Sequence, residues 1–105
     1  MDKLKISKIR IGDDLCITVS GGDKPHIGST AIAVSRQSLL GNGRLSCTSS
    51  VINQPGHKDE AVIRKIAEEA CCKYGCTVVC TGGIHIDGIT KAQIDELLQT
   101  DFENI

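Results

Sequence analysis

Apolar and polar residues alternate along the first half of the chain, which is the pattern of half-buried β-strands. The pattern predicts strands over residues 4–11, 15–19, 30–34 and 44–52. In the first run the alternation changes phase between Ile6 and Ile9, which predicts a β-bulge near residues 7–8. Gly12 follows as a turn residue, so the first two runs are expected to form a hairpin. Residues 20–25 combine glycine with proline and predict a break in regular structure.

The second half of the chain changes to the period of an α-helix. Apolar residues recur every three or four positions over residues 62–71, and Gly75 follows where a helix C-cap favours glycine. Residues 76–80 are nearly continuously apolar, which is typical of a short strand buried on both faces. Glycines divide residues 81–89, so this stretch is expected to be a loop.

A capping-box pattern, with Thr90 at the N-cap and Gln93 three residues later, predicts a C-terminal helix. The resulting order is four strands, a helix, a strand and a helix, without an internal repeat or a linker. Residues 1–105 are therefore expected to form a single domain. We predict an α+β fold in which two helices pack on one side of a mostly antiparallel sheet.

Composition narrows the classes of function. The 105 residues are 40% hydrophobic and 2% aromatic, and the formal net charge is −1 at pH 7. Scarce aromatic side chains and the lack of basic excess argue against a nucleic-acid-binding module, which uses stacking platforms and positive charge. No apolar run approaches the ~20 residues that span a bilayer, and the first residues lack the apolar core of a secretory signal. A cytoplasmic protein without membrane contact is expected.

Six cysteines would indicate disulfides in a small secreted chain, but a cytoplasmic chain keeps them as thiols. Their spacing contains no Cys-x-x-Cys pair, so a structural zinc site is not supported. Because free cysteine behaves as a small buried hydrophobe, most of the six are expected to pack in the core. None lies at a predicted helix N-terminus, so a nucleophilic cysteine is not expected.

All three histidines, His26, His57 and His85, fall in glycine-containing stretches beside the ends of predicted elements. Each separation is long enough to hold one or two elements, so the three stretches could converge at one edge of the sheet. Neighbouring glycines allow a ligand to approach the backbone closely. His57 and Lys58 also precede a predicted helix, where backbone amides and positive charge suit an anionic group such as a phosphate.

Other interpretations of the histidines stay open. Each imidazole could simply form hydrogen bonds within its own turn. The three together could form a metal site that activates water, supported by Asp59 and Asp87, which would make the chain a small metal-dependent enzyme. Against this, no close pair of histidines lies on one helix or strand. The chain could also be a structural assembly partner that holds no small molecule.

Three motifs occur in order: GGDKPHIGS at residues 21–29, GHKD at residues 56–59 and GIHID at residues 83–87. Together they resemble those of the LpdD-like family of prenylated-flavin chaperones, which are associated with UbiD-type non-oxidative decarboxylases of aromatic acids. The resemblance implies a fold similar to proteasome-assembly-chaperone-like domains and a homodimer. It also implies binding of prenylated flavin mononucleotide (prenylated FMN), or FMN, for delivery to the decarboxylase or for its maturation.

On this resemblance the chain is an accessory protein and not an enzyme, and no catalytic or metal-binding residue is expected. The expected cofactor-binding residues are the three histidines with their neighbours: Gly22, Pro25, His26, Ile27, Gly28, Ser29, His57, Lys58, Gly83, His85 and Asp87. The chain offers almost no aromatic side chain to stack on a flavin. We therefore expect Ile27, Ile84 and Ile86 to supply an aliphatic wall, with a dimer interface supplying the other side.

Overall fold

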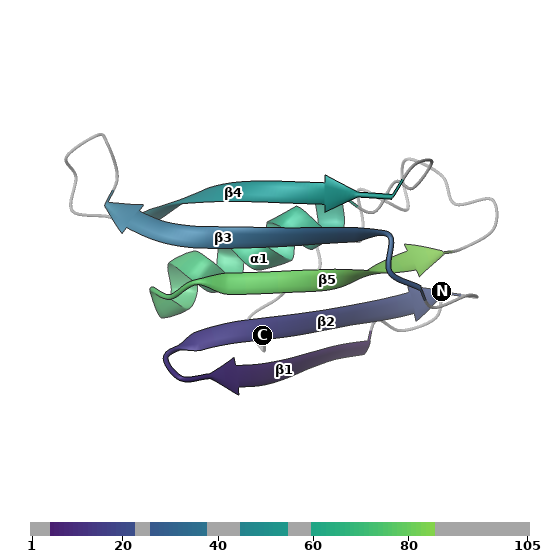
Figure 1. Ribbon diagram of the computed structural model, residues 1–105, viewed down its shortest axis with the longest axis horizontal. Coiled ribbons are helices and arrows are strands. Elements are labelled where there is room, and N and C mark those ends of the chain that lie inside the picture. Colours follow the sequence, from purple (N-terminus) through teal and green to yellow (C-terminus); the bar gives the residue numbers. More distant parts are fainter. Residues whose placement is uncertain (1–4, 23–25, 38–44, 55–59, 86–105) are drawn as a thin grey trace.

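A computed structural model gives the fold and describes residues 5–22, 26–37, 45–54 and 60–85. The described chain forms five strands and one helix (Figure 1). In chain order these elements are β1 (Lys5–Ile11), β2 (Asp14–Gly22), β3 (Ser29–Gln37), β4 (Leu45–Asn53), α1 (Glu60–Tyr74) and β5 (Val78–His85). The first four strands and the helix lie close to their predicted positions, whereas β5 extends into the stretch that was expected to be a loop.

The five strands form one mixed sheet in the order β1-β2-β5-β3-β4. β5 pairs parallel with β2 on one side and antiparallel with β3 on the other. The prediction of two helices packed on a mostly antiparallel sheet is therefore wrong: the sheet is mixed, and the described residues contain one helix, although the class is α+β. The helix expected from Thr90 onward falls outside the described residues.

The parallel pair arises from the way in which β5 enters the sheet. The chain leaves β4, runs through α1 and returns between β2 and β3. A helical crossover of this kind brings a strand back in the same direction as the strand before it. β5 therefore runs parallel to β4, which lies beyond β3, and also to its neighbour β2.

Glycine lets β2 and β5 pair over the full length of β5. The break predicted over residues 20–25 begins later than expected, because β2 continues to Gly22, which pairs with His85. Gly82 has a φ of 144°, and a Cβ built there would lie 1.8 Å from the carbonyl oxygen of Val19 on β2. Only glycine fits at this close approach, so Gly82 serves strand pairing.

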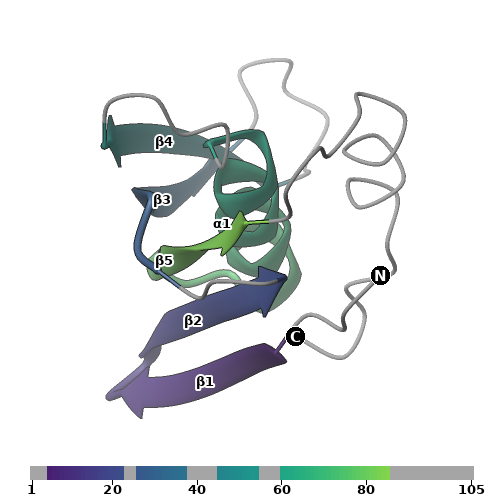
Figure 2. The same cartoon turned by 90° about the vertical axis from the view of Figure 1, so that its right-hand side faces the viewer.

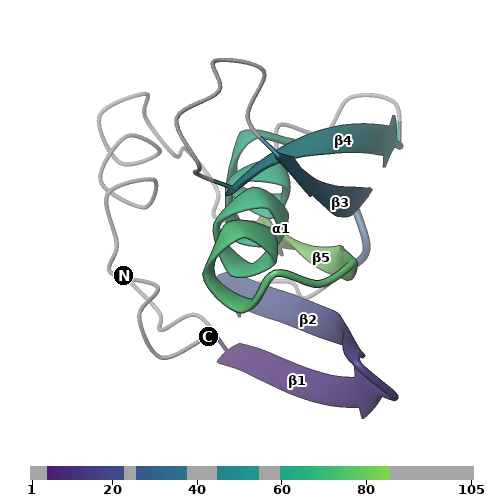
Figure 3. The ribbon, with the colours of Figure 1, turned by 90° about the vertical axis from the view of Figure 1, so that its left-hand side faces the viewer.

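The hydrophobic core lies between α1 and one face of the sheet (Figures 2 and 3). The predicted apolar stripe of the helix is confirmed by its buried residues, which are Val62, Ile63, Ile66, Ala67, Ala70 and Cys71. On the sheet the core residues are Leu15, Ile17, Val19, Ala31, Ala33, Val78 and Cys80. They alternate along β2, β3 and β5, as expected for strands with one covered face. Within the described ranges, no helix has both the length and the apolar composition required to cross a bilayer.

β1 continues the hairpin without the bulge predicted near residues 7–8. It pairs with β2 at every position from Lys5 to Ile11. The change of phase in the sequence instead moves apolar side chains from one face of the sheet to the other. Ile6 packs against the core, whereas Ile9 and Ile11 lie on the opposite face and are more than half exposed.

That opposite face of the sheet is not covered by any described element (Figures 2 and 3). The strand registers align an apolar row across it, which consists of Ile9, Cys16, Val79 and Ile32. The next row is made of hydroxyl side chains, Ser7, Thr18, Thr81 and Thr30. Neither row contains a charged side chain, whereas Lys5, Asp14 and Arg36 lie on the same face nearer its ends, so the middle of this open face suits an uncharged, partly apolar partner surface.

Candidate functional site

Four strands end or begin at one edge of the sheet. β2 and β5 run in the same direction, and their last residues, Gly22 and His85, lie opposite each other. β3 runs the other way and begins at the same edge, where Ser29 lies opposite Asn53 at the end of β4 (Figure 1). We call the edge marked by these four residues the histidine edge, because His85 lies on it and the segment containing His26 connects two of its strands.

Gly28 ties the segment before β3 to the neighbouring strands. Its amide donates a hydrogen bond to the carbonyl of Gly82 on β5 (2.9 Å), and its carbonyl accepts one from the amide of Gln54 after β4 (2.9 Å). Gly28 is buried, whereas His26 is partly buried and Ile27 is 58% exposed. Since β5 lies between β2 and β3, this segment crosses the end of β5 and holds His26 and Ile27 at the histidine edge.

A series of side-chain contacts links the histidine edge to the start of α1. The buried hydroxyl of Ser29 donates to Oδ1 of Asn53 at 2.6 Å, and Nδ2 of Asn53 donates to the Glu60 carboxylate at 2.6 Å. Glu60 also forms an ion pair with Arg64, one turn further along the helix, at 3.2 Å. These contacts were not predicted, because no local pattern shows that Asn53 faces a residue 24 positions away.

The structure gathers most of the predicted cofactor-binding residues at this edge. Those that are described are Gly22, His26, Ile27, Gly28, Ser29, Gly83 and His85, the last by its backbone position. The others, Pro25, His57, Lys58 and Asp87, lie outside the described residues. The Ser29 hydroxyl and the backbone of Gly28 are used within the protein, whereas Gly22 is only partly buried.

Metal binding by the histidine trio is not tested, because His57 lies outside the described residues. In the part of the chain that is described, no three side chains of histidine, cysteine, aspartate or glutamate are grouped to hold a metal ion. The described part of the histidine edge instead combines an imidazole, an exposed aliphatic side chain and close-packed glycines. Such a set can contact an anionic group and an apolar surface of one ligand.

The described chain is thus a small α+β domain in which four strand ends and several glycines meet at one edge. The sequence model of the prenylated flavin chaperone LpdD-like domain matches residues 2–103. The chain belongs to this family, and the family resemblance predicted from the sequence is confirmed. The family description indicates a chaperone role for prenylated flavin.

A curated relative, Protein LpdD of Lactiplantibacillus plantarum (strain ATCC BAA-793 / NCIMB 8826 / WCFS1), is 33% identical to this chain. The alignment extends over 91 residues and covers 80% of this chain. The chain spans 58% of the length of that relative. The similarity therefore concerns a little more than half of the relative.

Proposed function

We propose that this chain binds prenylated FMN, or FMN, at the histidine edge and acts in the cytoplasm as a cofactor chaperone for a UbiD-type non-oxidative aromatic acid decarboxylase. It delivers the cofactor to that enzyme or assists its maturation, and it catalyses no reaction itself. Membership of the prenylated flavin chaperone family supports the flavin and the chaperone role. The observation that carries the proposed site is the His26 segment, which Gly28 fixes across the aligned ends of the strands.

The described residues of the histidine edge fit a phosphorylated ligand with a large apolar ring. Gly22 has no side chain and is only partly buried, so a flat ring can approach the backbone there. Ile27 offers an exposed apolar side chain, and the neighbouring imidazole of His26 can donate a hydrogen bond to a phosphate oxygen. The cofactor itself supplies the chemistry of decarboxylation, so this chain needs only to hold the cofactor and release it.

The chain is expected to retain prenylated FMN or FMN through gel filtration, and His26→Ala is expected to raise the Kd about tenfold. A tenfold rise in the Kd corresponds to the loss of one hydrogen bond to a charged phosphate, which contributes about 1.5 kcal/mol of binding free energy. Titration followed by flavin absorbance measures the Kd. Riboflavin has the flavin ring but lacks the phosphate, so it tests whether His26 contacts the phosphate. The parent and His26→Ala should bind riboflavin equally weakly.

Arg36→Ala provides the matched control, because it removes an exposed cation near the far end of β3 and should leave the Kd unchanged. As a second readout, the loaded chain should activate cofactor-free decarboxylase faster than free cofactor does, and His26→Ala should lose this advantage. A parent chain that retains no flavin, or a His26→Ala variant with the parent's Kd for FMN and prenylated FMN, would contradict the proposal.

We further propose that the chain forms a homodimer through the open face of the sheet. A face of five strands, each of about nine residues, covers roughly 600 Å² at the usual strand spacing and rise. This is close to the roughly 800 Å² that each partner buries in a stable interface. The two uncharged rows support stacking of the middle of two such faces, because neither row carries a charge.

Ile32→Glu should raise the dissociation constant of the dimer at least tenfold, because it places a carboxylate at one end of the apolar row. Ile32 is 42% exposed, so its side chain is available to a partner while the fold tolerates the change. Analytical ultracentrifugation measures the effect. Ala61→Glu, on an exposed position of α1, adds the same charge on the other side of the sheet and should leave the dimer intact. A parent that stays monomeric at high concentration would exclude this interface.

A further inference from the structure

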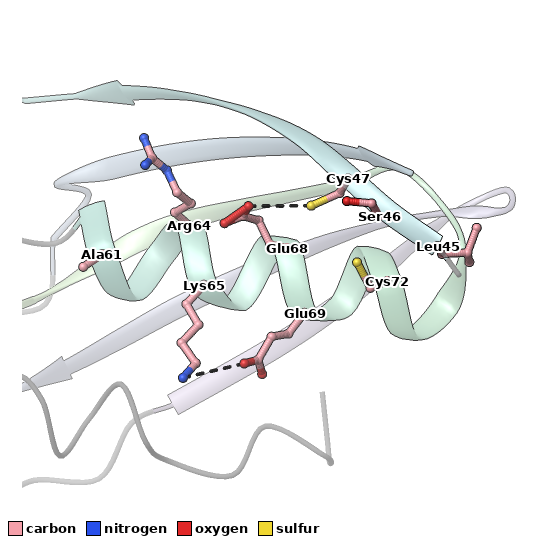
Figure 4. A pocket seen from close by; sticks show the side chains of 9 residues that line it. All are labelled: Leu45, Ser46, Cys47, Ala61, Arg64, Lys65, Glu68, Glu69 and Cys72. Atoms are coloured by element: carbon pink, nitrogen blue, oxygen red, sulfur yellow. Dashed lines mark hydrogen bonds and ion pairs between the residues drawn. The ribbon is translucent and has the colours of Figure 1, made fainter. Parts of the chain in front are cut away.

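Two thiols from different elements meet in the groove between β4 and α1. The groove has a volume of about 470 Å³, and Cys47 on β4 and Cys72 on α1 both line it. Cys47 is half-buried and Cys72 is exposed. Cys72 is among the groups that raise the pKa of Cys47, and Figure 4 shows the Cys72 sulfur pointing from the helix toward the strand that carries Cys47. A solvent-accessible thiol thus has a second thiol as its direct neighbour.

Glu68 places a carboxylate beside this thiol pair (Figure 4). The Cys47 thiol donates a hydrogen bond to Oε2 of Glu68 at 3.6 Å, and the Ser49 hydroxyl donates to the same oxygen at 3.4 Å. Glu68 lies four positions before Cys72, so the two share one face of α1. The carboxylate is therefore in position to accept the proton of Cys47.

We propose that Cys47 and Cys72 form a reversible disulfide across the groove when the chain meets a small disulfide such as oxidised glutathione. The bond joins β4 to α1 and closes the end of the groove at which the two thiols lie. Exposed Cys72 reacts with the external disulfide, and Cys47 then completes the bond. Together with Glu68 they form a thiol switch that the proposed flavin function does not use.

The exchange proceeds in two steps that conserve atoms and electrons. The thiolate of Cys72, formed by loss of a proton to solvent, attacks one sulfur of oxidised glutathione, and one glutathione leaves as its thiolate. Cys47 passes its proton to Glu68 and attacks the Cys72 sulfur, and the second glutathione leaves. The released glutathione thiolates take up the two protons. Two protein thiols are thus oxidised to a disulfide, and one external disulfide is reduced to two thiols.

The electrostatic surroundings of Cys47 favour this order of events. Burial is the first cause that raises the pKa of Cys47 to about 12, and the charges of Cys72 and Glu68 follow. Cys47 therefore stays protonated at neutral pH and does not react first. Once Cys72 is bonded to glutathione it no longer carries a thiolate charge. One cause of the raised pKa of Cys47 is then removed, which eases the second step.

Cys71, Cys76 and Cys80 are less suited to this exchange. Cys71 and Cys80 have no exposed surface, so a molecule of the size of glutathione cannot reach them. Burial, followed by the charges of Cys72 and Cys76, also raises the pKa of Cys71. Cys76 is half-buried and lies beyond the end of α1. Cys47 lines the same groove as Cys72, whereas Cys71, Cys76 and Cys80 do not, so Cys47 is the partner for Cys72.

The thiol pair is remote from the histidine edge. Cys47 lies near the start of β4, whereas Asn53 at its other end marks that edge. The disulfide should therefore leave flavin binding unchanged, so failure of one proposal does not affect the other. Closing a loop of about 25 residues restricts the unfolded chain, and the oxidised protein should show a Tm at least about 5 °C above that of the reduced protein.

The experiment treats the reduced full-length chain with oxidised glutathione, blocks the remaining thiols with iodoacetamide and identifies cross-linked peptides by mass spectrometry. A Cys47–Cys72 cross-link that dithiothreitol removes, together with the rise in Tm, is expected. Cys72→Ser, an exposed substitution, should abolish the cross-link, whereas Cys76→Ser should retain it. Glu68→Gln should slow the second step at least about tenfold without changing the first, and Glu69→Gln should slow neither step.

Several outcomes would overturn the proposal. They are a mixed disulfide of Cys72 with glutathione that persists in the folded parent, a bond from Cys72 to Cys71 or Cys76, a bond between two chains, and an absence of oxidation. If the second step were equally fast in Glu68→Gln, the Glu68 carboxylate would not be the acceptor of the Cys47 proton.

Discussion

Gly82→Ala is expected to lower the free energy of unfolding by about 4 kcal/mol. The added Cβ would lie 1.8 Å from the carbonyl oxygen of Val19, at a φ of 144° that side chains rarely adopt. Backbone strain and overpacking each cost about 1–3 kcal/mol, and both act here. β5 cannot simply move away, because the Gly82 carbonyl accepts the amide hydrogen bond of Gly28. Urea denaturation followed by circular dichroism measures the loss.

Gly12→Ala is the matched control for this substitution. Gly12 also has a positive φ, +60°, but no atom lies within 4 Å of a Cβ built there. Only backbone strain remains, so a loss of about 1 kcal/mol is expected. Equal losses in the two variants would show that the close approach of β2 and β5 is not what requires glycine. The Gly82→Ala variant, where it folds, should also bind flavin more weakly, since the Gly28 segment rests on β5.

Asn53→Ala is expected to lower the free energy of unfolding by about 2 kcal/mol. It leaves the Ser29 hydroxyl, in a residue only 2% exposed, without its acceptor and removes the donor to Glu60. A buried polar group that loses its partner costs about 1–3 kcal/mol, and the contact with Glu60 adds less because it is exposed. The start of α1 should also loosen, which hydrogen exchange of its first-turn amides would detect.

A double-mutant cycle separates the two contacts of Asn53. Ser29→Ala and Asn53→Ala should be non-additive by about 1 kcal/mol, because each removes the same hydrogen bond. Asn53→Asp keeps an acceptor for Ser29 but brings a second carboxylate to Glu60, so it should preserve the first contact and lose the second. Full additivity in the cycle would mean that the 2.6 Å contact contributes nothing to stability.

The grouping of the described site residues depends on particular strand positions. The glycines and the histidine at residues 21–29 predict a loop that could bind a ligand. The turn residue between the first two strands predicts the hairpin that places β1 beside β2. Gly28 could be recognised as part of a motif, but its bonds to Gly82 and Gln54 depend on strands that meet only in the folded chain. The residues next to Asn53 in the sequence do not indicate that it links β3 to α1. It does so only because Ser29 lies opposite it in the sheet.

Side-chain periodicity alone was enough to reveal the four N-terminal strands, the apolar stripe of α1 and the α+β class, because each is set by residues close together in the chain. The insertion of β5 between β2 and β3, its parallel pairing and its continuation through Gly82 and Gly83 required the tertiary structure. Pairing partners are chosen by the burial of whole faces and by backbone contacts between distant segments. In the sequence alone, Gly82 indicates a loop. In the folded protein it lies within β5, because the carbonyl of Val19 on β2 occupies the space that a side chain would fill.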